Sequence, residues 1–444
     1  MNKTLPRLGA PLLTILFSIM MMLYVSAQAG PDPGEGALNA YRTAMLLSAS
    51  MAAAAFLLDI FRGIRVQSML LALSILSACG CTLQFLLGHI REHLIYQAAF
   101  LLTGTFVFLF VSGTCNVRKP LFLLAASSVL ALLVINYLFG APPKGSYTTA
   151  RLWIFIGGIS VQPGEIVKIL LIFLGASSYR KWYRCAISFA LCLLSCLVLL
   201  KLDDMGNAAV IFLILVVQVF YLLDSWKLAL CLVAAAFSAF MWLIQHSAYA
   251  RLRLSNWGHA MERPGGVHQQ ADLLEEILFG GLLKGTGPSA VKRLGTVFAV
   301  ESDLAIGALL AIFGAGILII ILGAYVILIC QASTNHSIYP FSHLVLVQAS
   351  MMIFAQVFLN FGGSIDLIPL TGITAPLISL GGSSMVCFGA LSGMCLAALC
   401  PVLRSVDSER QETENVDILS NLARWIAGGI KEVLCTVRKK DTEN

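Results

Sequence analysis

Carboxylates and cations in or beside apolar segments are the residues of this sequence that are best equipped for chemistry. Asp303 follows a long polar loop and begins an apolar segment. A carboxylate can act as a general base when it lies within hydrogen-bond reach of a substrate hydroxyl. Glu165 and Lys168 share one face of a helix because they stand three residues apart, and Asp204 opens the segment DMGNAA. Charged side chains are costly in apolar surroundings, so each of these residues is a functional candidate.

The same residues also have structural interpretations, and the sequence alone leaves both kinds open. Ser302 suits the N-cap of a helix that starts here, and Asp303 would complement the positive end of that helix dipole. Asp204 suits a helix N-terminus in the same way. Glu165 and Lys168 can neutralise each other as an internal ion pair that only fixes helix packing.

A long polar loop, 246–302, supplies cations just before Asp303. An anionic leaving group would need such cations nearby. The other interpretation is a merely solvated loop, because long loops escape the charge rule that governs short ones. The candidate cations are Arg251, Arg253, Arg263, Lys284 and Lys292.

The stretch 360–384, NFGGSIDLIPLTGITAPLISLGGSS, lies between two long apolar segments and carries no Lys or Arg. Backbone that is not helical at membrane depth persists only when it is buried in protein or lines a watery cavity. The stretch is therefore a candidate wall of a site. The backbone N–H groups of its Gly-Gly-Ser-Ser run could also hold a phosphate.

Composition indicates the elements that must position these groups. The chain has 444 residues, of which 58% are hydrophobic and 12% charged, whereas soluble domains carry about 25% charged residues. Recurring apolar runs of about 20 residues predict an all-α, polytopic membrane bundle rather than a barrel. The modest net charge of +6 does not indicate nucleic-acid binding. We predict about twelve transmembrane helices, at 8–28, 40–61, 67–88, 95–113, 119–139, 163–178, 184–201, 205–223, 227–245, 303–330, 340–361 and 376–402.

Lys and Arg in the short loops predict the orientation. They gather on the side that holds both termini, so both termini are predicted to be cytoplasmic and the 246–302 loop extracellular. The first span has a second interpretation, a signal peptide that ends near Gly30. The tail beyond Arg404 is either an amphipathic helix on the inner leaflet or partly disordered.

The 12 cysteines lie almost entirely inside apolar runs, which is typical of small packing residues. The sequence holds no dedicated metal-ligand cluster and identifies no cofactor. It leaves open whether a divalent cation takes part.

Several of these residues occur together in one known pattern. The chain resembles the SEDS family (shape, elongation, division and sporulation), which comprises the FtsW, RodA and SpoVE proteins. The most specific matching segment is IPLTGITAPLISLGGSS from Ile368. The others are ARLWIFIGGISVQPGEIVK (150–168), DMGNAA from Asp204, GGLLKGTG from Gly280, SDLAIGALLAIFGAGI from Ser302, and Gln356 with Asn360.

The resemblance implies three parts and an activity. An extra N-terminal transmembrane hairpin (1–66) precedes a ten-helix glycosyltransferase core (67–402) and a cytoplasmic tail (403–444). The implied activity is that of an inverting peptidoglycan glycosyltransferase in the bacterial plasma membrane. It would polymerise lipid II at the outer face for elongation, division or sporulation, commonly with a class B penicillin-binding protein.

The resemblance implies Asp303 as the catalytic carboxylate. Together with the cations of the loops, the residues expected to bind or enclose the lipid-linked substrate are Arg151, Trp153, Gln162, Glu165, Lys168, Asp204, Lys284, Asn360, Pro369, Thr371, Gly372, Pro376, Ser379, Gly381, Gly382 and Ser383.

The chain departs from the family pattern at several points. The adjacent Arg-Trp of the family reads Leu152-Trp153, with Arg151 one place early. A Glu-Glu-Leu-Gly motif reads Ala311-Ile312-Phe313-Gly314, so both of its carboxylates are absent. This divergence keeps two other classes of protein open. One is a flippase or transporter of a lipid-linked precursor, and the other is a non-catalytic scaffold that recruits a penicillin-binding protein.

Overall fold

The computed structural model describes residues 6–28, 35–62, 64–113, 118–142, 150–246, 251, 254–255, 257–262, 269–331 and 340–399. The predicted C-terminal tail, 403–444, lies outside the described residues, as do Arg253 and Arg263 of the loop. The predicted division of the chain into three parts stays a prediction.

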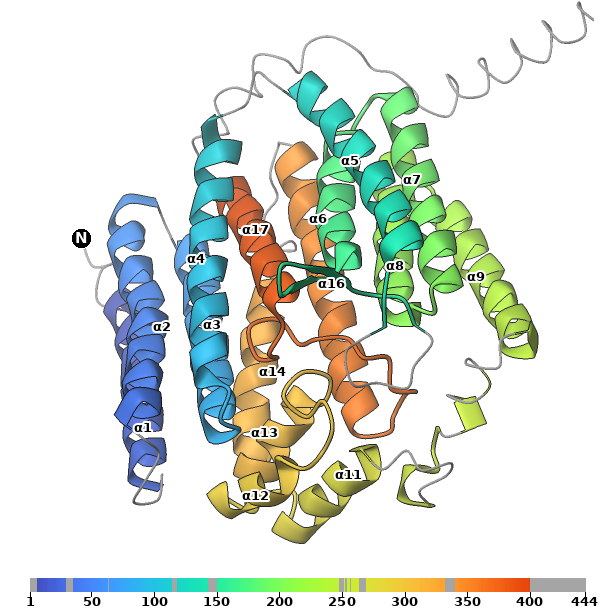
Figure 1. The fold of residues 1–444 in the computed structure, drawn as a ribbon. Helices are drawn as coiled ribbons and strands as arrows, with labels where there is room; N and C mark the ends of the chain where they lie inside the picture. Colours follow the sequence, from blue (N-terminus) through green and yellow to red (C-terminus); the bar gives the residue numbers. More distant parts are fainter. Residues whose placement is uncertain are drawn as a thin grey trace, which may run out of the picture.

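The described chain is a bundle of long helices, which confirms the predicted all-α class (Figure 1). Seven of the described helices are long and apolar enough to cross a membrane, and further apolar helices are shorter. The helices of the bundle are α1 (Pro6–Gln28), α2 (Glu35–Arg62), α3 (Ile64–Leu86), α4 (Ile90–Gly113), α5 (Arg118–Phe139), α6 (Pro163–Ala176), α7 (Trp182–Lys201), α8 (Met205–Leu223), α9 (Trp226–His246), α13 (Ala305–Phe313), α14 (Ala315–Ile329), α16 (Pro340–Ser364) and α17 (Gly382–Leu399).

The span predicted at 303–330 is wrong as a single helix, because Gly314 divides it into α13 and α14. Gly314 has φ 74°, which is the left-handed region that favours glycine. A Cβ atom at this position would collide with the carbonyl oxygen of Leu283. The last predicted span also starts too early, since α17 begins at Gly382 and the residues before it form an irregular loop.

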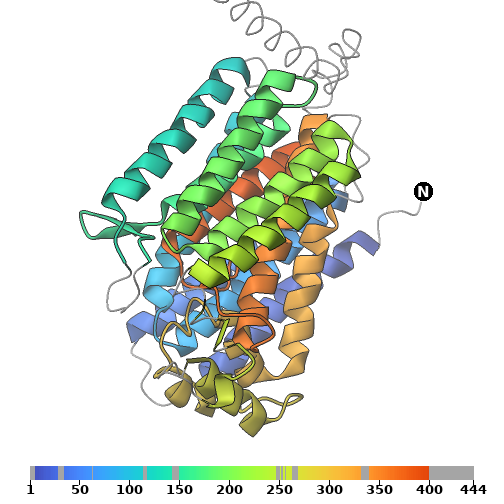
Figure 2. The ribbon, with the colours of Figure 1, turned by 90° about the vertical axis from the view of Figure 1, so that its right-hand side faces the viewer.

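A β-hairpin that the sequence did not predict precedes α6. Its strands, β1 (Ile154–Ile156) and β2 (Ile159–Val161), are antiparallel and joined by two residues. These residues are Gly157 (φ 56°) and Gly158 (φ 88°). Positive φ at both positions belongs to the two-residue turn whose twist suits a hairpin. The hairpin projects from the side of the bundle, near the end of α5 and the start of α6 (Figure 2).

Small residues and a buried polar cluster hold the helices together. Backbone approaches closely where α4 meets α17, because a Cβ on Gly104 would lie 3.2 Å from the Gly389 carbonyl oxygen; small residues are favoured at such helix contacts in membranes. The buried polar cluster joins α4 to two other helices. Gln97 Nε2 of α4 donates to Ser48 Oγ of α2 at 3.0 Å and to Ser77 Oγ of α3 at 2.7 Å. The N-terminal hairpin of α1 and α2 is thereby fastened to the bundle.

The loop predicted at 246–302 contains short helices. They are η1 (Ala260–Glu262), α11 (Gln269–Gly280), η3 (Pro288–Ala290) and α12 (Val291–Leu294). α11, α12 and α13 gather at one end of the bundle (Figure 1). We call this the α11–α12 end.

Candidate functional site

Asp303 lies half-buried in a series of turns immediately before α13. The helix begins at Ala305 with Leu304 at its N-cap, and no side chain caps it. Ser302 Oγ instead donates back to the Ala299 carbonyl oxygen at 3.4 Å. The predicted N-cap role of Ser302 is therefore wrong, because the chain makes further turns before it becomes helical.

Asn360, on α16, fixes the backbone around Asp303. Its Nδ2 donates to the carbonyl oxygens of Asp303 at 3.0 Å, Ile373 at 2.8 Å and Ser302 at 3.2 Å. Its Oδ1 accepts from the Ile306 N–H at 3.4 Å. Asn360 was predicted to bind substrate, but its amide is fully engaged with backbone groups. We therefore assign it a positioning role.

The irregular loop 365–381 is attached to the turns that carry Asp303. Ser379 Oγ donates to the Ser302 carbonyl oxygen, and the Leu380 N–H donates to the Glu301 carbonyl oxygen at 2.8 Å. Gln84, on α3, donates from Nε2 to the Glu301 and Ile378 carbonyl oxygens at 2.9 and 3.1 Å. Ser379 was predicted to bind substrate, but its hydroxyl instead joins the loop 365–381 to the turns before α13. Gln84 was not predicted, although an amide near the end of an apolar helix was a usable signal.

Gly372 brings this loop next to the Asp303 carboxylate. A Cβ placed on Gly372 would lie 3.4 Å from Asp303 Oδ2. Its φ of 72° is again in the left-handed region. The loop therefore passes beside the carboxylate with its smallest residue, which leaves space there for another group.

A second cluster of charges forms where α6 and α8 begin. Lys168 Nζ donates to Glu165 Oε1 at 2.7 Å, and these side chains are 0% and 3% exposed. Asp204 caps α8 by accepting from the Asn207 N–H at 3.1 Å and from Asn207 Nδ2 at 2.9 Å. The internal ion pair and the cap that the sequence allowed are both present. A Cβ on Gly164 would lie 3.5 Å from Asp204 Oδ2, so α6 and α8 meet at their N-termini.

Residues 371–373 connect the two clusters. A Cβ on Gly206, at the start of α8, would lie 3.1 Å from the Thr371 carbonyl oxygen and would collide with the side chain of Ile373. Gly372, between them, faces Asp303. One short segment of the loop thus separates Asp303 from the N-terminus of α8.

Buried polar atoms near this segment have no hydrogen-bond partner among the described residues. They include Glu165 Oε2, Asn207 Oδ1 and Thr371 Oγ1, and both polar atoms of Gln356. Buried polar groups are nearly always hydrogen-bonded, and leaving one unpaired costs free energy. These atoms mark a place that suits the polar groups of a ligand.

The start of α17 joins the hairpin to this region. The Gln162 N–H donates to Ser383 Oγ at 3.0 Å, and Ser383 Oγ donates to the Ser160 carbonyl oxygen at 3.4 Å. Pro376 contributes its carbonyl oxygen to Tyr325 Oη at 2.6 Å. Pro369, Thr371, Gly381 and Gly382 complete the loop and its junction with α17.

The predicted residues outside the two clusters are more peripheral. Arg151 has an exposed side chain, and Trp153 pairs through its backbone with Ala141 beside the hairpin. The backbone of Lys284 lies against Gly314, at the turn between α13 and α14. This is the opposite end of α13 from Asp303 and Gly372. Among the described residues, no group of three His, Cys, Asp or Glu side chains could hold a metal ion.

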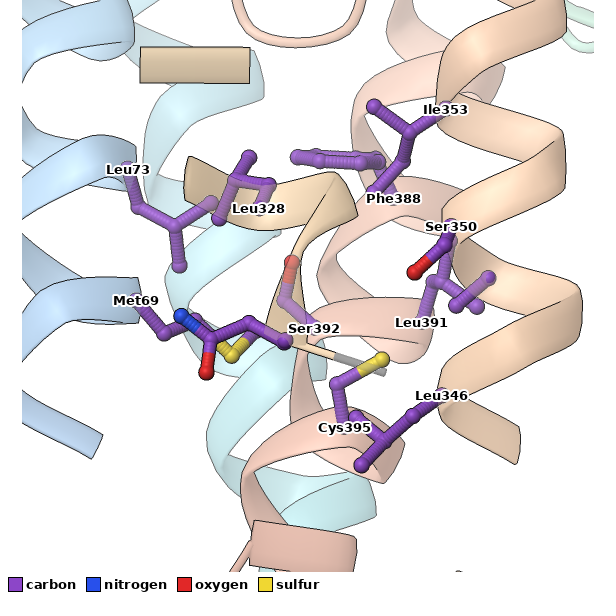
Figure 3. A pocket seen from close by; sticks show the side chains of 12 residues that line it. Met69, Leu73, Leu328, Leu346, Ser350, Ile353, Phe388, Leu391, Ser392 and Cys395 are labelled. Atoms are coloured by element: carbon purple, nitrogen blue, oxygen red, sulfur yellow. The ribbon is translucent and has the colours of Figure 1, made fainter. Parts of the chain in front are cut away.

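A separate pocket lies between α3, α14, α16 and α17 (Figure 3). Its lining includes Leu73, Leu328, Ser350, Ser392 and Cys395, and it contains none of the predicted site residues.

Comparison with known proteins assigns this chain to a family. Residues 60–400 match the FtsW/RodA/SpoVE family, described as "Cell cycle protein". The chain belongs to this family.

Curated relatives agree with the match. The probable peptidoglycan glycosyltransferase FtsW of Bacillus subtilis is 29% identical over 295 residues, which cover 61% of this chain and 70% of the relative. A protein of the same name from Borreliella burgdorferi is 30% identical over 290 residues, with 60% and 75% covered.

Two solved structures show the same fold. One, reported as "Structural coordination of polymerization and crosslinking by a peptidoglycan synthase complex", has a TM-score of 0.59 at 22% identity and covers 78% of this chain and 98% of its own. A mutant of the rod shape determining protein RodA of Thermus thermophilus gives a TM-score of 0.50 at 22% identity, with 74% and 96% covered.

Proposed function

We propose that this chain is a peptidoglycan glycosyltransferase that polymerises lipid II. The observation that carries the proposal is the position of Asp303. Asn360 donates a hydrogen bond to the Asp303 carbonyl oxygen, and the Asp303 carboxylate lies beside Gly372, which has no Cβ atom. Residues 371–373 separate Asp303 from a set of buried polar atoms that have no hydrogen-bond partner among the described residues. The names of the curated relatives support the same activity.

In the proposed reaction, a sugar 4-hydroxyl of the acceptor attacks C1 of the lipid-linked donor. The Asp303 carboxylate takes the hydroxyl proton as the new glycosidic bond forms. The bond from C1 to the pyrophosphate oxygen breaks, and undecaprenyl pyrophosphate leaves with the bonding electrons. One displacement with a single base inverts the configuration at C1.

The leaving pyrophosphate needs positive potential, and the described cations differ in what they can supply. Lys168 is already paired with Glu165 at 2.7 Å, so its charge is largely balanced. The side chain of Arg151 is exposed and can turn toward an anionic group. The N-termini of α6 and α8 add the positive ends of two helix dipoles beside the cluster.

The divergent segment 311–314 is compatible with this reaction. Ala311 and Ile312 are each 1% exposed and lie in the apolar core. The residues that replace the family carboxylates are therefore buried in protein, where a carboxylate would be costly. The remaining carboxylate, Asp303, carries the proposed chemistry alone.

We further propose that the α11–α12 end faces outward and that both termini are cytoplasmic. The distribution of Lys and Arg in the short loops supports this orientation. A class B penicillin-binding protein is the proposed partner. The solved complex that shares this fold is described as coordinating polymerization and crosslinking.

Purified protein with labelled lipid II tests the activity, with and without a class B penicillin-binding protein. Glycan polymer is expected from the wild type and is expected to be absent with Asp303→Ala. Complex formation without polymer under any condition would indicate a scaffold. Movement of lipid II across a vesicle membrane without polymer would indicate a flippase.

A further inference from the structure

An exposed apolar patch lies at the α11–α12 end. Leu278, Phe279, Leu282 and Leu283 are 69%, 75%, 60% and 81% exposed. Single exposed apolar residues are common, but a contiguous group of large ones marks an interaction surface. We call these residues the 278–283 patch.

The backbone places this patch at the level where a membrane span starts. The Ala315 N–H, the first of α14, donates to the Leu282 carbonyl oxygen at 2.8 Å. α14 has 15 residues, which corresponds to about 22 Å. The apolar layer of a bilayer is about 30 Å thick. α14 alone is therefore too short to cross this layer, and the patch adds apolar surface next to its first residue.

Cations border the patch. Lys284 and Lys292 are exposed, and the Arg293 guanidinium lies 4.9 Å from the centre of the Phe279 ring. Arg293 also donates to both carboxylate oxygens of Glu276 at 2.6 and 2.8 Å. This pair joins α11 to α12. Apolar side chains flanked by Lys and Arg are typical of segments that lie in a membrane interface and favour anionic lipid.

Glu275 marks the boundary of this surface. It is exposed one turn before Leu278 on α11. A carboxylate in this position suits water rather than acyl chains. The C-terminal end of α11 and the turn after it can therefore enter the interface while the preceding turn stays outside.

We propose that residues 278–284 are an interfacial anchor that inserts into the boundary between headgroups and acyl chains and prefers anionic lipid. The partner of this surface is thus the bilayer itself. η3, α12 and the turns that end at Asp303 follow the anchor in the chain. The anchor consequently sets the depth of Asp303 relative to the membrane surface, where the headgroup of a lipid-linked molecule lies.

The depth of the anchor can be measured in nanodiscs without any assay of activity. A fluorescent non-natural amino acid is placed at position 283, at 275 or at 319 in the full chain. Position 319 is a membrane control because Ile319 is 70% exposed on the apolar helix α14. We expect lipids brominated in their acyl chains to quench positions 283 and 319. Aqueous iodide should quench position 275.

Anionic lipid tests the role of the cations. Exchanging phosphatidylcholine for a mixture with phosphatidylglycerol should raise quenching by brominated lipid at position 283 by at least about twofold. Lys292→Gln should weaken that response, whereas Lys227→Gln, which changes an exposed lysine at the start of α9, should leave it unchanged. Iodide quenching at position 283 without quenching by brominated lipid would overturn the proposal. Protection of position 283 only after a penicillin-binding protein is added would overturn it in favour of a protein interface.

Discussion

Replacing Asn360 with Ala removes the side chain that joins the turns around Asp303 to the loop 365–381. The carbonyl oxygens of Asp303 and Ile373 lose their side-chain donor, and the Ile306 N–H loses its acceptor. The Ser302 carbonyl oxygen keeps its bond from Ser379. Each buried group left unpaired costs about 1–3 kcal/mol.

The expected total for these three groups is therefore about 3–9 kcal/mol. Part of this cost should appear as lower thermal stability, and part as displacement of Asp303. A displacement that costs about 1.4 kcal/mol in the transition state lowers the rate tenfold. We expect Asn360→Ala to lower kcat for lipid II polymerisation at least about tenfold at a temperature where the variant is still folded.

Gln97→Ala is the matched control for this prediction. Gln97 Nε2 also donates to three oxygens, those of Ala44, Ser48 and Ser77. These bonds join α4 to α2 and α3 rather than to the turns around Asp303. Its loss should lower thermal stability without a matching loss of kcat. Equal losses of kcat in the two variants, or full kcat in Asn360→Ala, would refute the positioning role.

Three other substitutions test the remaining geometry. Gly372→Ala places a side chain at φ 72°, which costs about 1–2 kcal/mol, and should lower polymerisation; Gly316→Ala, with open space around it, should not. Lys168→Met leaves Glu165 as an uncompensated buried charge and should lower the free energy of unfolding by about 3–5 kcal/mol, whereas adding Glu165→Gln should restore part of it. The hydrogen bond from the Arg293 guanidinium lowers the pKa of Glu276. The pair therefore stabilises the fold at a pH above the ordinary glutamate pKa, and this stabilisation is lost as the pH falls from that value through the lowered pKa of Glu276. Thermal unfolding from neutral to acid pH should show this loss in the wild type, and Glu276→Gln should reduce the pH dependence; an unchanged dependence would contradict the assignment.

The length of the apolar runs was sufficient to predict the long helices, because a membrane span must satisfy its backbone internally over a fixed length. The break between α13 and α14 at Gly314 could not be predicted from the apolar run. It depends on the close approach of Leu283, which is distant in the predicted layout. The β1–β2 hairpin was missed because its residues lie in the loop between the spans predicted at 119–139 and 163–178, where no local pattern shows which residues pair.

The candidate site was predictable in its residue types and less so in their roles. The spacing of Glu165 and Lys168 indicated their ion pair correctly. Asn360 and Ser379 were expected to touch substrate, but both bond to backbone groups that only the folded loop brings near. The buried contact of Gln84 with residues 301 and 378 likewise joins segments far apart in the chain. Such roles depend on tertiary contacts that no local pattern contains.

The most direct test of the central claim compares single-turnover rates of Asp303→Asn and Asp224→Asn with labelled lipid II in nanodiscs. Asp224 is a matched control because it is a C-cap in the left-handed region, at φ 49°, where asparagine is well tolerated. We expect Asp303→Asn to bind lipid II with nearly wild-type affinity and to form glycosidic bonds at least about 100-fold more slowly, the minimum loss for a general base. Asp224→Asn should match the wild type. Wild-type rates in Asp303→Asn would contradict the assignment of Asp303 as the base.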